Sequence, residues 1–284
     1  MKKAFVVGHP IRHSRSPLIH SHWLKKYRIE GSYERIDVTP GDFADFLLEF
    51  PERGFVGGNV TIPHKEAAFE DVARLTERGK RLRAVNTLWT EDGLLWGDNT
   101  DVLGFMAHMD ETLGDGWEQE IETALVIGAG GAARAVVAGL LERPIGRVIV
   151  VNRTPSKAVS LVVDFLGEVD GRGRIDVCPS SELDGLIPRA QLIVNTTSLG
   201  MAGQDALPVD LSSASPRTAV ADIVYVPLRT PLLHAAAARG LRTVDGLGML
   251  LHQAAPGFAR WFGVTPEVTP ELRALVVRDI EGRP

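Results

Sequence analysis

Four polar clusters in the first hundred residues carry groups that could bind and protonate a small anionic molecule. Each cluster follows a stretch predicted to be a strand, and they lie at residues 13–16, 59–65, 86–87 and 97–101. Serine hydroxyls can hold a carboxylate, amides can hold hydroxyl groups, and a pair such as Lys65 and Asp101 can move a proton. Ligands of open α/β sheets bind outside the carboxyl ends of strands, so the clusters together favour a substrate site.

Each of these residues also has an ordinary structural explanation. Ser16 and Asp101 could cap the helices that follow them, and Thr61 could simply end a strand. Lys65 could lie in the solvated first turn of a helix, where most lysines are found. Taken singly, the structural explanation is the more common one, and only the recurrence of four polar turns at strand ends favours a site.

A second motif is a glycine-rich turn between a predicted buried strand and a predicted helix. The turn consists of Gly128, Ala129, Gly130, Gly131 and Ala132. Glycines permit the tight turn and let backbone N–H groups approach a pyrophosphate at the positive end of the helix. Ala133 replaces the last glycine of the usual spacing, and such a motif is weak alone. The strand before it and the helix after it favour a dinucleotide site.

The tip of the next predicted strand indicates which dinucleotide binds. It reads Asn152, Arg153 and Thr154, with Lys157 one turn later. NAD sites place an acidic residue here to bind the ribose 2′-hydroxyl. A guanidinium and a hydroxyl suit a 2′-phosphate, which a carboxylate would repel. The sequence therefore predicts NADP.

The overall composition excludes several other classes of protein. The 284 residues carry a formal charge of −5, which gives no electrostatic footprint for nucleic acid. The single cysteine, Cys178, excludes an internal disulfide and fits a reducing compartment. Neither a signal peptide nor an apolar stretch of about 20 residues is recognisable, so we expect a cytoplasmic protein without contact to membranes. The histidines show no metal-ligand spacing, and we expect no metal.

The pattern of apolar residues predicts an α/β protein. Short apolar runs alternate with helical patterns, which is typical of βαβ units and largely parallel sheets. We expect Ser16 to cap a helix that has Pro17 in its first turn. Pro256 lies inside the helix predicted for residues 247–262 and should kink or split it.

In these motifs and several others, the chain closely resembles the shikimate dehydrogenase family over nearly its whole length. The shared motifs lie at residues 8–20, 59–65, 84–87, 97–104, 128–135, 152–154, 195–201, 222–225 and 245–253. The resemblance implies NADPH-dependent reduction of 3-dehydroshikimate to shikimate, in the pathway to chorismate and the aromatic amino acids. It also implies an N-terminal α/β substrate domain (residues 1–104 and 247–284) and a Rossmann-type NADP domain (residues 105–246), separated by a cleft.

The resemblance further implies individual roles. Lys65 is the catalytic acid/base, and Asp101 assists it. The substrate-binding residues are Ser14, Ser16, Thr61, Asn86, Asp101, Tyr225 and Gln253. The cofactor-binding residues are Glu77, Gly128, Ala129, Gly130, Gly131, Ala132, Asn152, Arg153, Thr154, Lys157, Ile223 and Gly246. The oligomeric state stays open, a homodimer included.

The chain departs from the family's pattern at Ser21, His64 and Pro256, none of which carries the expected chemistry. Three alternatives stay open. One is a quinate/shikimate dehydrogenase that uses NAD or both cofactors, against which Arg153 counts. Another is a non-catalytic sensor of shikimate-type ligands, against which the intact Lys65 and Asp101 count. The third is a different two-domain NADP enzyme, such as a methylenetetrahydrofolate dehydrogenase, in which Ser14 and Ser16 would lack a purpose.

Overall fold

The computed structural model describes residues 1–166 and 174–282. Residues 167–173, within the predicted NADP domain, and residues 283–284, at the end of the predicted substrate domain, lie outside the described residues. The chain divides into two compact units. The first comprises Met1–Gly104 and Leu250–Asp279, and the second comprises Phe105–Met249 and Ile280–Pro284.

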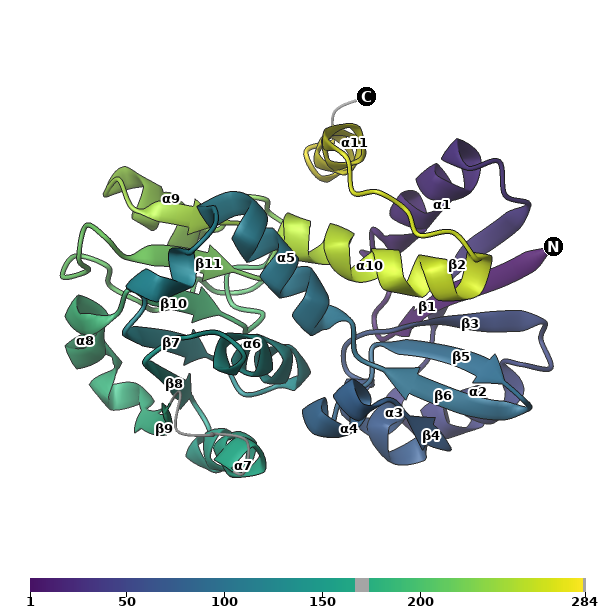
Figure 1. Ribbon diagram of the computed structural model, residues 1–284, viewed down its shortest axis with the longest axis horizontal. Helices are drawn as coiled ribbons and strands as arrows, with labels where there is room; N and C mark the ends of the chain where they lie inside the picture. Colours follow the sequence, from purple (N-terminus) through teal and green to yellow (C-terminus); the bar gives the residue numbers. More distant parts are fainter. Residues whose placement is uncertain (167–173, 283–284) are drawn as a thin grey trace. The chain divides into compact units, whose positions relative to one another are not determined.

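The first unit is built on a mixed six-stranded sheet in the order β2-β1-β3-β5-β6-β4 (Figure 1). The strands are β1 (Lys2–Gly8), β2 (Gly31–Asp37), β3 (Phe55–Val60), β4 (Arg74–Leu75), β5 (Thr87–Glu91) and β6 (Leu94–Asp98). Strands β5 and β6 form an antiparallel hairpin, and Asp92 and Gly93 at its tip have the positive φ angles of such turns. Parallel pairing of β1 with β2 and β3 brings the carboxyl ends of these strands to one edge.

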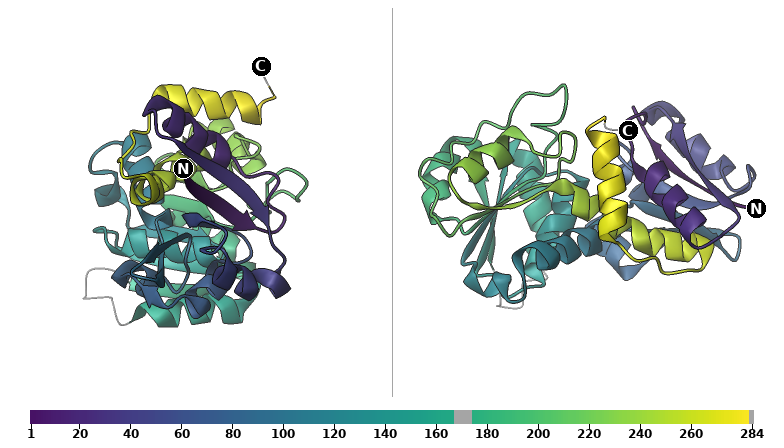
Figure 2. Two further views of the ribbon diagram at one scale, coloured as in Figure 1. Left: turned by 90° about the vertical axis from the view of Figure 1, so that its right-hand side faces the viewer. Right: turned by 90° about the horizontal axis from the view of Figure 1, so that it is seen from above.

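Helices cover both faces of this sheet. They are α1 (Ser16–Lys26), α2 (Phe43–Glu49), α3 (Lys65–Asp71), α4 (Glu77–Leu82), the first turn of α5 (Asp101–Leu113), most of α10 (Gly246–Phe262) and α11 (Pro270–Ile280). Phe5 of β1 packs edge-on against Phe46 and Phe50 on the side of α2. Helix α11 lies beside α1, and Arg15 Nε is 2.5 Å from Asp279 Oδ2 (Figure 2).

The second unit is a doubly wound α/β fold. Its sheet has the order β12-β11-β10-β7-β8-β9, and all its pairings are parallel. The strands are β7 (Thr123–Ile127), β8 (Arg147–Asn152), β9 (Arg174–Pro179), β10 (Leu192–Asn195), β11 (Ala219–Asp222) and β12 (Arg242–Val244). This is the dinucleotide-binding order, with the reversal between β7 and β10.

Helices cover both faces of the second sheet as well. They include α6 (Gly131–Leu141), α7 (Pro155–Phe165), α9 (Pro231–Ala238) and the single-turn α8 (Leu183–Leu186), and the part of α5 from residue 105 onward also belongs to this unit. Leu183 of α8 and Leu232 of α9 share one apolar core with Leu125 and Ile149 of the sheet. The fold class predicted from the sequence, a Rossmann-type domain and a further α/β domain, is confirmed.

One local prediction was wrong. Helix α1 begins at Ser16, with Arg15 at the cap position and no side-chain cap, because the Ser16 side chain is buried instead. Pro256 does not split helix α10, which continues from Gly246 to Phe262. Phe258 and Trp261 beyond the proline are fully or almost fully buried, and their packing stabilises the second half of the helix.

Among the described residues, no helix is both long enough and apolar enough to cross a membrane.

An aromatic cluster fixes α1 and α10 against the sheet. His20 of α1 is stacked on Tyr33 of β2, with ring centroids 3.9 Å apart and an interplanar angle of 8°. Trp23, Phe258 and Trp261 surround the imidazole. Burial lowers the pKa of His20 to about 3, and the nearby Asn59 side chain opposes this only in part. The cluster therefore accepts His20 only as the neutral ring.

Acid should destabilise the protein through this residue. The unfolded chain takes up a proton at His20 below pH 6.5, whereas the folded chain does so only near pH 3. The free energy of unfolding should therefore fall by about 1.4 kcal/mol per pH unit within this window. Relative to His20→Phe, the parent protein should lose about 2 kcal/mol between pH 7.5 and pH 5 in urea unfolding. If the difference in the free energy of unfolding between the parent and His20→Phe is the same at pH 7.5 and pH 5, His20 is not the residue responsible. His234 is exposed, and His234→Phe serves as the control.

Candidate active site

The centre of the first unit's site is a lysine–carboxylate contact formed by the starts of two helices. Lys65 is the first residue of α3, and Asp101 is the first residue of α5. Lys65 Nζ lies 2.5 Å from Asp101 Oδ2. Asp101 is 4% exposed, whereas the Lys65 side chain keeps 16% of its surface accessible. The pair can thus hold a proton at an atom that solvent or a substrate can reach.

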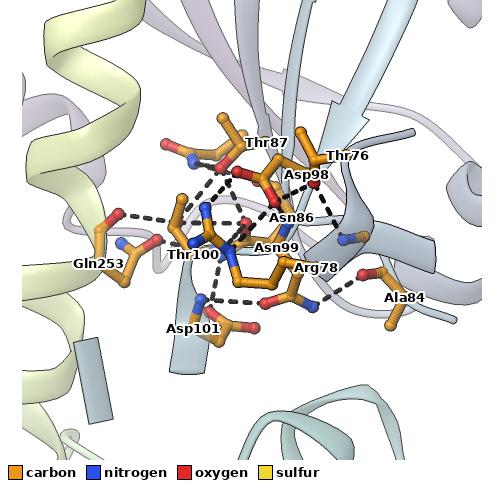
Figure 3. Close-up of polar contacts among 12 residues, drawn as sticks. Thr76, Arg78, Ala84, Asn86, Thr87, Asp98, Asn99, Thr100, Asp101 and Gln253 are labelled. Atoms are coloured by element: carbon orange, nitrogen blue, oxygen red, sulfur yellow. Dashed lines mark hydrogen bonds and ion pairs between the residues drawn. The ribbon is translucent and has the colours of Figure 1, made fainter. Parts of the chain in front are cut away.

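Two predicted amides complete this centre, as Figure 3 shows for the residues around Asp101. Asn86 Nδ2 donates to Asp101 Oδ1 at 2.8 Å and to Gln253 Oε1 at 3.3 Å. Asn86 Oδ1 accepts from the backbone N–H of Thr100 at 2.8 Å. The structure therefore brings together four of the predicted residues, which are Lys65, Asn86, Asp101 and Gln253.

A second layer of polar residues holds Asp101 and Asn86 in place. Asn99 Oδ1 accepts from the backbone N–H of Asp101 at 2.9 Å, and Asn99 Nδ2 donates to Ala84 O at 2.8 Å. The backbone N–H of Asn99 donates in turn to Asp98 Oδ1 at 2.7 Å. Asp98 also accepts from Thr76 Oγ1 at 2.6 Å and forms a two-point contact with the Arg78 guanidinium (Figure 3).

The other residues of this unit that we predicted to bind substrate lie after the ends of β1 and β3. Ser14 Oγ accepts from the backbone N–H of Ser16 at 3.3 Å, in the loop that follows β1. Thr61 follows β3, and its backbone N–H donates to Val7 O at 2.9 Å. A Cβ on Gly8 would come within 2.6 Å of Thr61 Cγ2, so the two loops pass very close to each other there.

Asn59 belongs to the polar cluster predicted at residues 59–65, although we assigned it no individual role. It is 5% exposed, and its Nδ2 donates to Asn86 O at 3.0 Å. Its Oδ1 accepts from the Tyr33 hydroxyl at 2.6 Å. Its position two residues before Thr61, on the same face of a strand, was the signal in the sequence that could have identified it. Glu77, in contrast, is a 92% exposed side chain, and its Oε1 lies 2.7 Å from Lys80 Nζ.

In the second unit the glycine turn connects β7 to α6. Gly128 has φ +121°, and a Cβ there would come within 2.3 Å of Thr196 Oγ1, so only glycine fits. Gly130 precedes the first turn of α6, and a Cβ there would meet no atom of residues 1–166 or 174–282 within 4 Å. Among these residues the space beside the helix N-terminus is open, as an anion-binding site requires.

The predicted cofactor-selecting residues follow the neighbouring strand. Parallel pairing of Ile127 with Val151 places the tip of β8 next to the glycine turn. Asn152 Nδ2 donates to Thr154 O at 2.9 Å and shapes this tip. The side chains of Arg153, Thr154 and Lys157 are exposed there.

The loop after β11 carries Ile223 and Tyr225 and is fixed by a buried carboxylate. Asp222 is 2% exposed and accepts from Thr230 Oγ1 (2.6 Å), Asn195 Nδ2 (2.9 Å) and the backbone N–H of Val224 (3.0 Å). Burial raises the pKa of Asp222, and these three hydrogen bonds oppose the rise. A Cβ on Gly246 would come within 2.2 Å of Ile223 O, so these two predicted cofactor residues lie next to each other.

One unit thus carries a lysine–carboxylate pair among hydrogen-bonding amides and hydroxyls. The other carries a parallel sheet in the dinucleotide-binding order, with a glycine turn at its switch point. Together these features define a two-domain α/β protein of the dinucleotide-dependent dehydrogenase class.

Three family models match the chain in order. The Shikimate dehydrogenase substrate binding domain matches residues 6–88, Shikimate / quinate 5-dehydrogenase matches residues 114–202, and the Shikimate 5'-dehydrogenase C-terminal domain matches residues 246–275. A shikimate dehydrogenase (NADP(+)) of Methylobacterium radiotolerans is 57% identical over 282 residues, which are 99% of this chain and 98% of that protein. The chain belongs to the shikimate dehydrogenase family, and this prediction from the sequence is confirmed.

Solved structures agree with this assignment. Shikimate 5-dehydrogenase of Thermus thermophilus, in complex with NADP(H) and shikimate, is 35% identical with a TM-score of 0.83. The match covers 99% of this chain and 100% of that one. Quinate dehydrogenase of Corynebacterium glutamicum, in complex with NAD, is 29% identical with a TM-score of 0.87, covering 97% and 98% of the two chains.

Removal of the Arg78 guanidinium should destabilise the substrate unit, because it leaves the Asp98 carboxylate without its cation. Asp98 has a 12% exposed side chain, while that of Arg78 is 33% exposed, so solvent softens the loss. We expect Arg78→Met to lower the free energy of unfolding by about 1–3 kcal/mol in urea titrations.

Asp98→Asn in the Arg78→Met background should recover part of this loss, since it removes the uncompensated charge. Arg53→Met, which breaks an exposed ion pair with Glu49, is the matched control and should change stability by less than about 0.5 kcal/mol. Equal effects of Arg78→Met and Arg53→Met would contradict a structural role for the Arg78–Asp98 contact.

Proposed function

We propose that this protein catalyses the NADPH-dependent reduction of 3-dehydroshikimate to shikimate, the step of the shikimate pathway that leads towards chorismate and the aromatic amino acids. It is an oxidoreductase that acts on a CH–OH group. The observation that carries the proposal is the 2.5 Å contact between Lys65 Nζ and Asp101 Oδ2, beside the amides of Asn86 and Gln253. Such a site offers one mobile proton and several hydrogen-bonding groups for ring hydroxyls.

NADP fits the residues of the second unit. The open space at Gly130 and the N-terminus of α6 suit a pyrophosphate, for which Gly128, Ala129, Gly131 and Ala132 form the rest of the turn. The exposed Arg153 and Lys157 suit a 2′-phosphate, with Asn152 and Thr154 beside them. Ile223 and Gly246 lie next to each other, and we assign them to the nicotinamide end. We keep Glu77 as a weaker cofactor residue.

We assign the substrate's parts to residues by their chemistry. Ser14 and Ser16 bind the carboxylate, and Thr61, Asn86, Asp101 and Gln253 bind the ring hydroxyls. Tyr225, on the loop fixed by Asp222, lies beside the substrate. On this assignment the substrate domain (residues 1–104 and 247–284) corresponds largely to the first unit, and the NADP domain (residues 105–246) corresponds largely to the second.

The protein's own residues then perform the proton transfer. NADPH supplies the hydride when it is bound. As the ketone oxygen gathers negative charge, Lys65 Nζ donates a proton to it, and in the reverse direction Lys65 accepts the proton of the hydroxyl. Asp101 accepts hydrogen bonds from Lys65 and Asn86, so that it directs the ammonium group and orients the hydroxyl. General acid/base help of this kind accelerates a reaction by about 10²–10⁴-fold.

We infer a cytoplasmic location, since the single cysteine fits a reducing compartment. The acidic net charge supports an enzyme that binds only small molecules and no nucleic acid. A homodimer is compatible with this proposal.

The second candidate is a quinate/shikimate dehydrogenase that uses NAD, favoured by the similarity to the NAD-bound quinate dehydrogenase. Nucleotide reduction should be measured with shikimate and with quinate, each with NADP⁺ and with NAD⁺. We expect the shikimate and NADP⁺ combination to give the highest kcat/KM by at least about tenfold, because an Arg153–phosphate contact is worth more than one hydrogen bond. Faster turnover of quinate with NAD⁺ would establish the second candidate, and no turnover in any combination would overturn the enzyme assignment.

Lys65→Ala should reduce kcat at least ~100-fold with little change in the KM for shikimate, because it removes a group that acts in the transition state. Lys25→Ala, on the exposed surface of α1, is the control for the loss of a lysine. A loss of less than tenfold in steady-state assays would remove Lys65 from the acid/base role.

A further inference from the structure

Strand β2 presents three polar side chains to the loop between β1 and α1. Tyr33, Arg35 and Asp37 alternate along the strand, and therefore point to the same face of the sheet. This is the face covered by α1, because Tyr33 stacks on His20 of that helix. The loop, residues 9–15, carries Ser14 and leads into Ser16, the two residues that we assigned to the substrate carboxylate.

Asp37 and Arg35 hold the loop along its length. Asp37 Oδ1 is 2.6 Å from His9 Nδ1, and Asp37 Oδ2 accepts from the backbone N–H of Ile11 at 3.4 Å. The contact with His9 lowers the pKa of Asp37. Arg35 donates twice to the carbonyl of Ser14, from Nε at 2.9 Å and from Nη2 at 2.7 Å. Both donors on one carbonyl fix the backbone of Ser14.

Tyr33 acts at the end of the loop. Its ring is buried and stacked on His20, so its hydroxyl has little freedom to move. The hydroxyl donates to Asn59 Oδ1 at 2.6 Å, which leaves its oxygen lone pairs free to accept a hydrogen bond. Ser16 lies one turn before His20 on α1, so its side chain is on the face of the helix that packs over Tyr33. Ser16 is 5% exposed there. Burial raises the pKa of Tyr33, and the nearby Ser16 side chain opposes the rise.

We propose that Tyr33 and Arg35 are positioning residues for the substrate carboxylate: Tyr33 orients the hydroxyl of Ser16, and Arg35 fixes the backbone of Ser14. The proposal rests on the assignment of Ser14 and Ser16 to the carboxylate. Serine hydroxyls are neutral and rotate freely, so they bind an anion well only when their orientation is fixed before it arrives. The guanidinium of Arg35 also adds positive potential behind Ser14, where the two neutral hydroxyls supply none.

Tyr33→Phe removes only the hydroxyl and keeps the ring on His20. We expect the KM for shikimate to rise about fivefold or more, the effect of one hydrogen bond, with kcat within about twofold and the KM for NADP⁺ unchanged. Tyr27→Phe is the matched control, because the Tyr27 hydroxyl accepts from the backbone N–H of Glu267 at the opposite end of α1 from Ser16. A Tyr33→Phe protein with parental KM for shikimate would overturn the role of Tyr33.

A double-mutant cycle separates positioning from a general loss of packing. Ser16→Ala should itself raise the KM for shikimate, and adding Tyr33→Phe should then raise it by less than about twofold, because the group that Tyr33 orients is gone. Full additivity of the two changes would contradict the proposal. An unchanged KM in Ser16→Ala would instead overturn the carboxylate assignment, which is a different failure.

Arg35→Gln tests the proposal on the surface, where folding is not at risk because Arg35 is exposed. We expect the KM for shikimate to rise two- to fivefold, about the effect of losing one exposed charge. The rise should become smaller at high salt, because part of it is electrostatic. Arg53→Gln is the control for the loss of an exposed arginine. Equal KM values in Arg35→Gln and the parent would exclude Arg35 from the carboxylate site.

Discussion

The need to compensate a buried carboxylate organises the substrate unit. Asp101 is almost inaccessible, and a carboxylate in that position is costly unless charged or hydrogen-bonding groups surround it. Lys65 and Asn86 occupy its two oxygens, and its backbone N–H is bound by Asn99. The same contacts that compensate Asp101 also hold the ammonium and the amide to which we assign the reaction. On that assignment, stability and catalytic geometry depend on the same hydrogen bonds.

In the second unit a buried carboxylate is compensated by neutral groups, and no cation of residues 105–166 or 174–249 is recorded as its partner. Asp222 is as buried as Asp101, yet its described partners are Thr230, Asn195 and the backbone of Val224. Its raised pKa fits that difference, because neutral donors stabilise the carboxylate less than an ammonium group would. This suits a carboxylate that fixes a loop: the hydrogen bonds determine the path of the backbone into Ile223 and Tyr225, and no proton has to move.

A feature could be predicted from the sequence when the residues that form it are close together in the chain. The turn at Gly128 was predictable because strand, glycines and helix are contiguous. Lys65 and Asp101 could be named as a pair from residue type and the family's motifs, but their contact joins residues 36 apart and required the fold. Arg78 was missed because β4 and α4 are too short to give a periodic pattern. Tyr33 was visible only as a strand residue, since its role depends on the strand pairing that places it under α1.

The proposed substrate and cofactor sites also differ in how many hydrogen bonds their residues make with neighbouring residues. This difference affects how easily cofactor preference can change. Asn86 and Asp101 share hydrogen bonds with each other and with their neighbours, so a change at either disturbs several contacts at once. Arg153 and Lys157 are exposed at a strand tip. A change there alters the charge offered to a nucleotide but leaves the buried contacts intact. We therefore expect cofactor preference to vary within this fold more readily than the chemistry, and the NAD complex of the similar quinate dehydrogenase is in keeping with that.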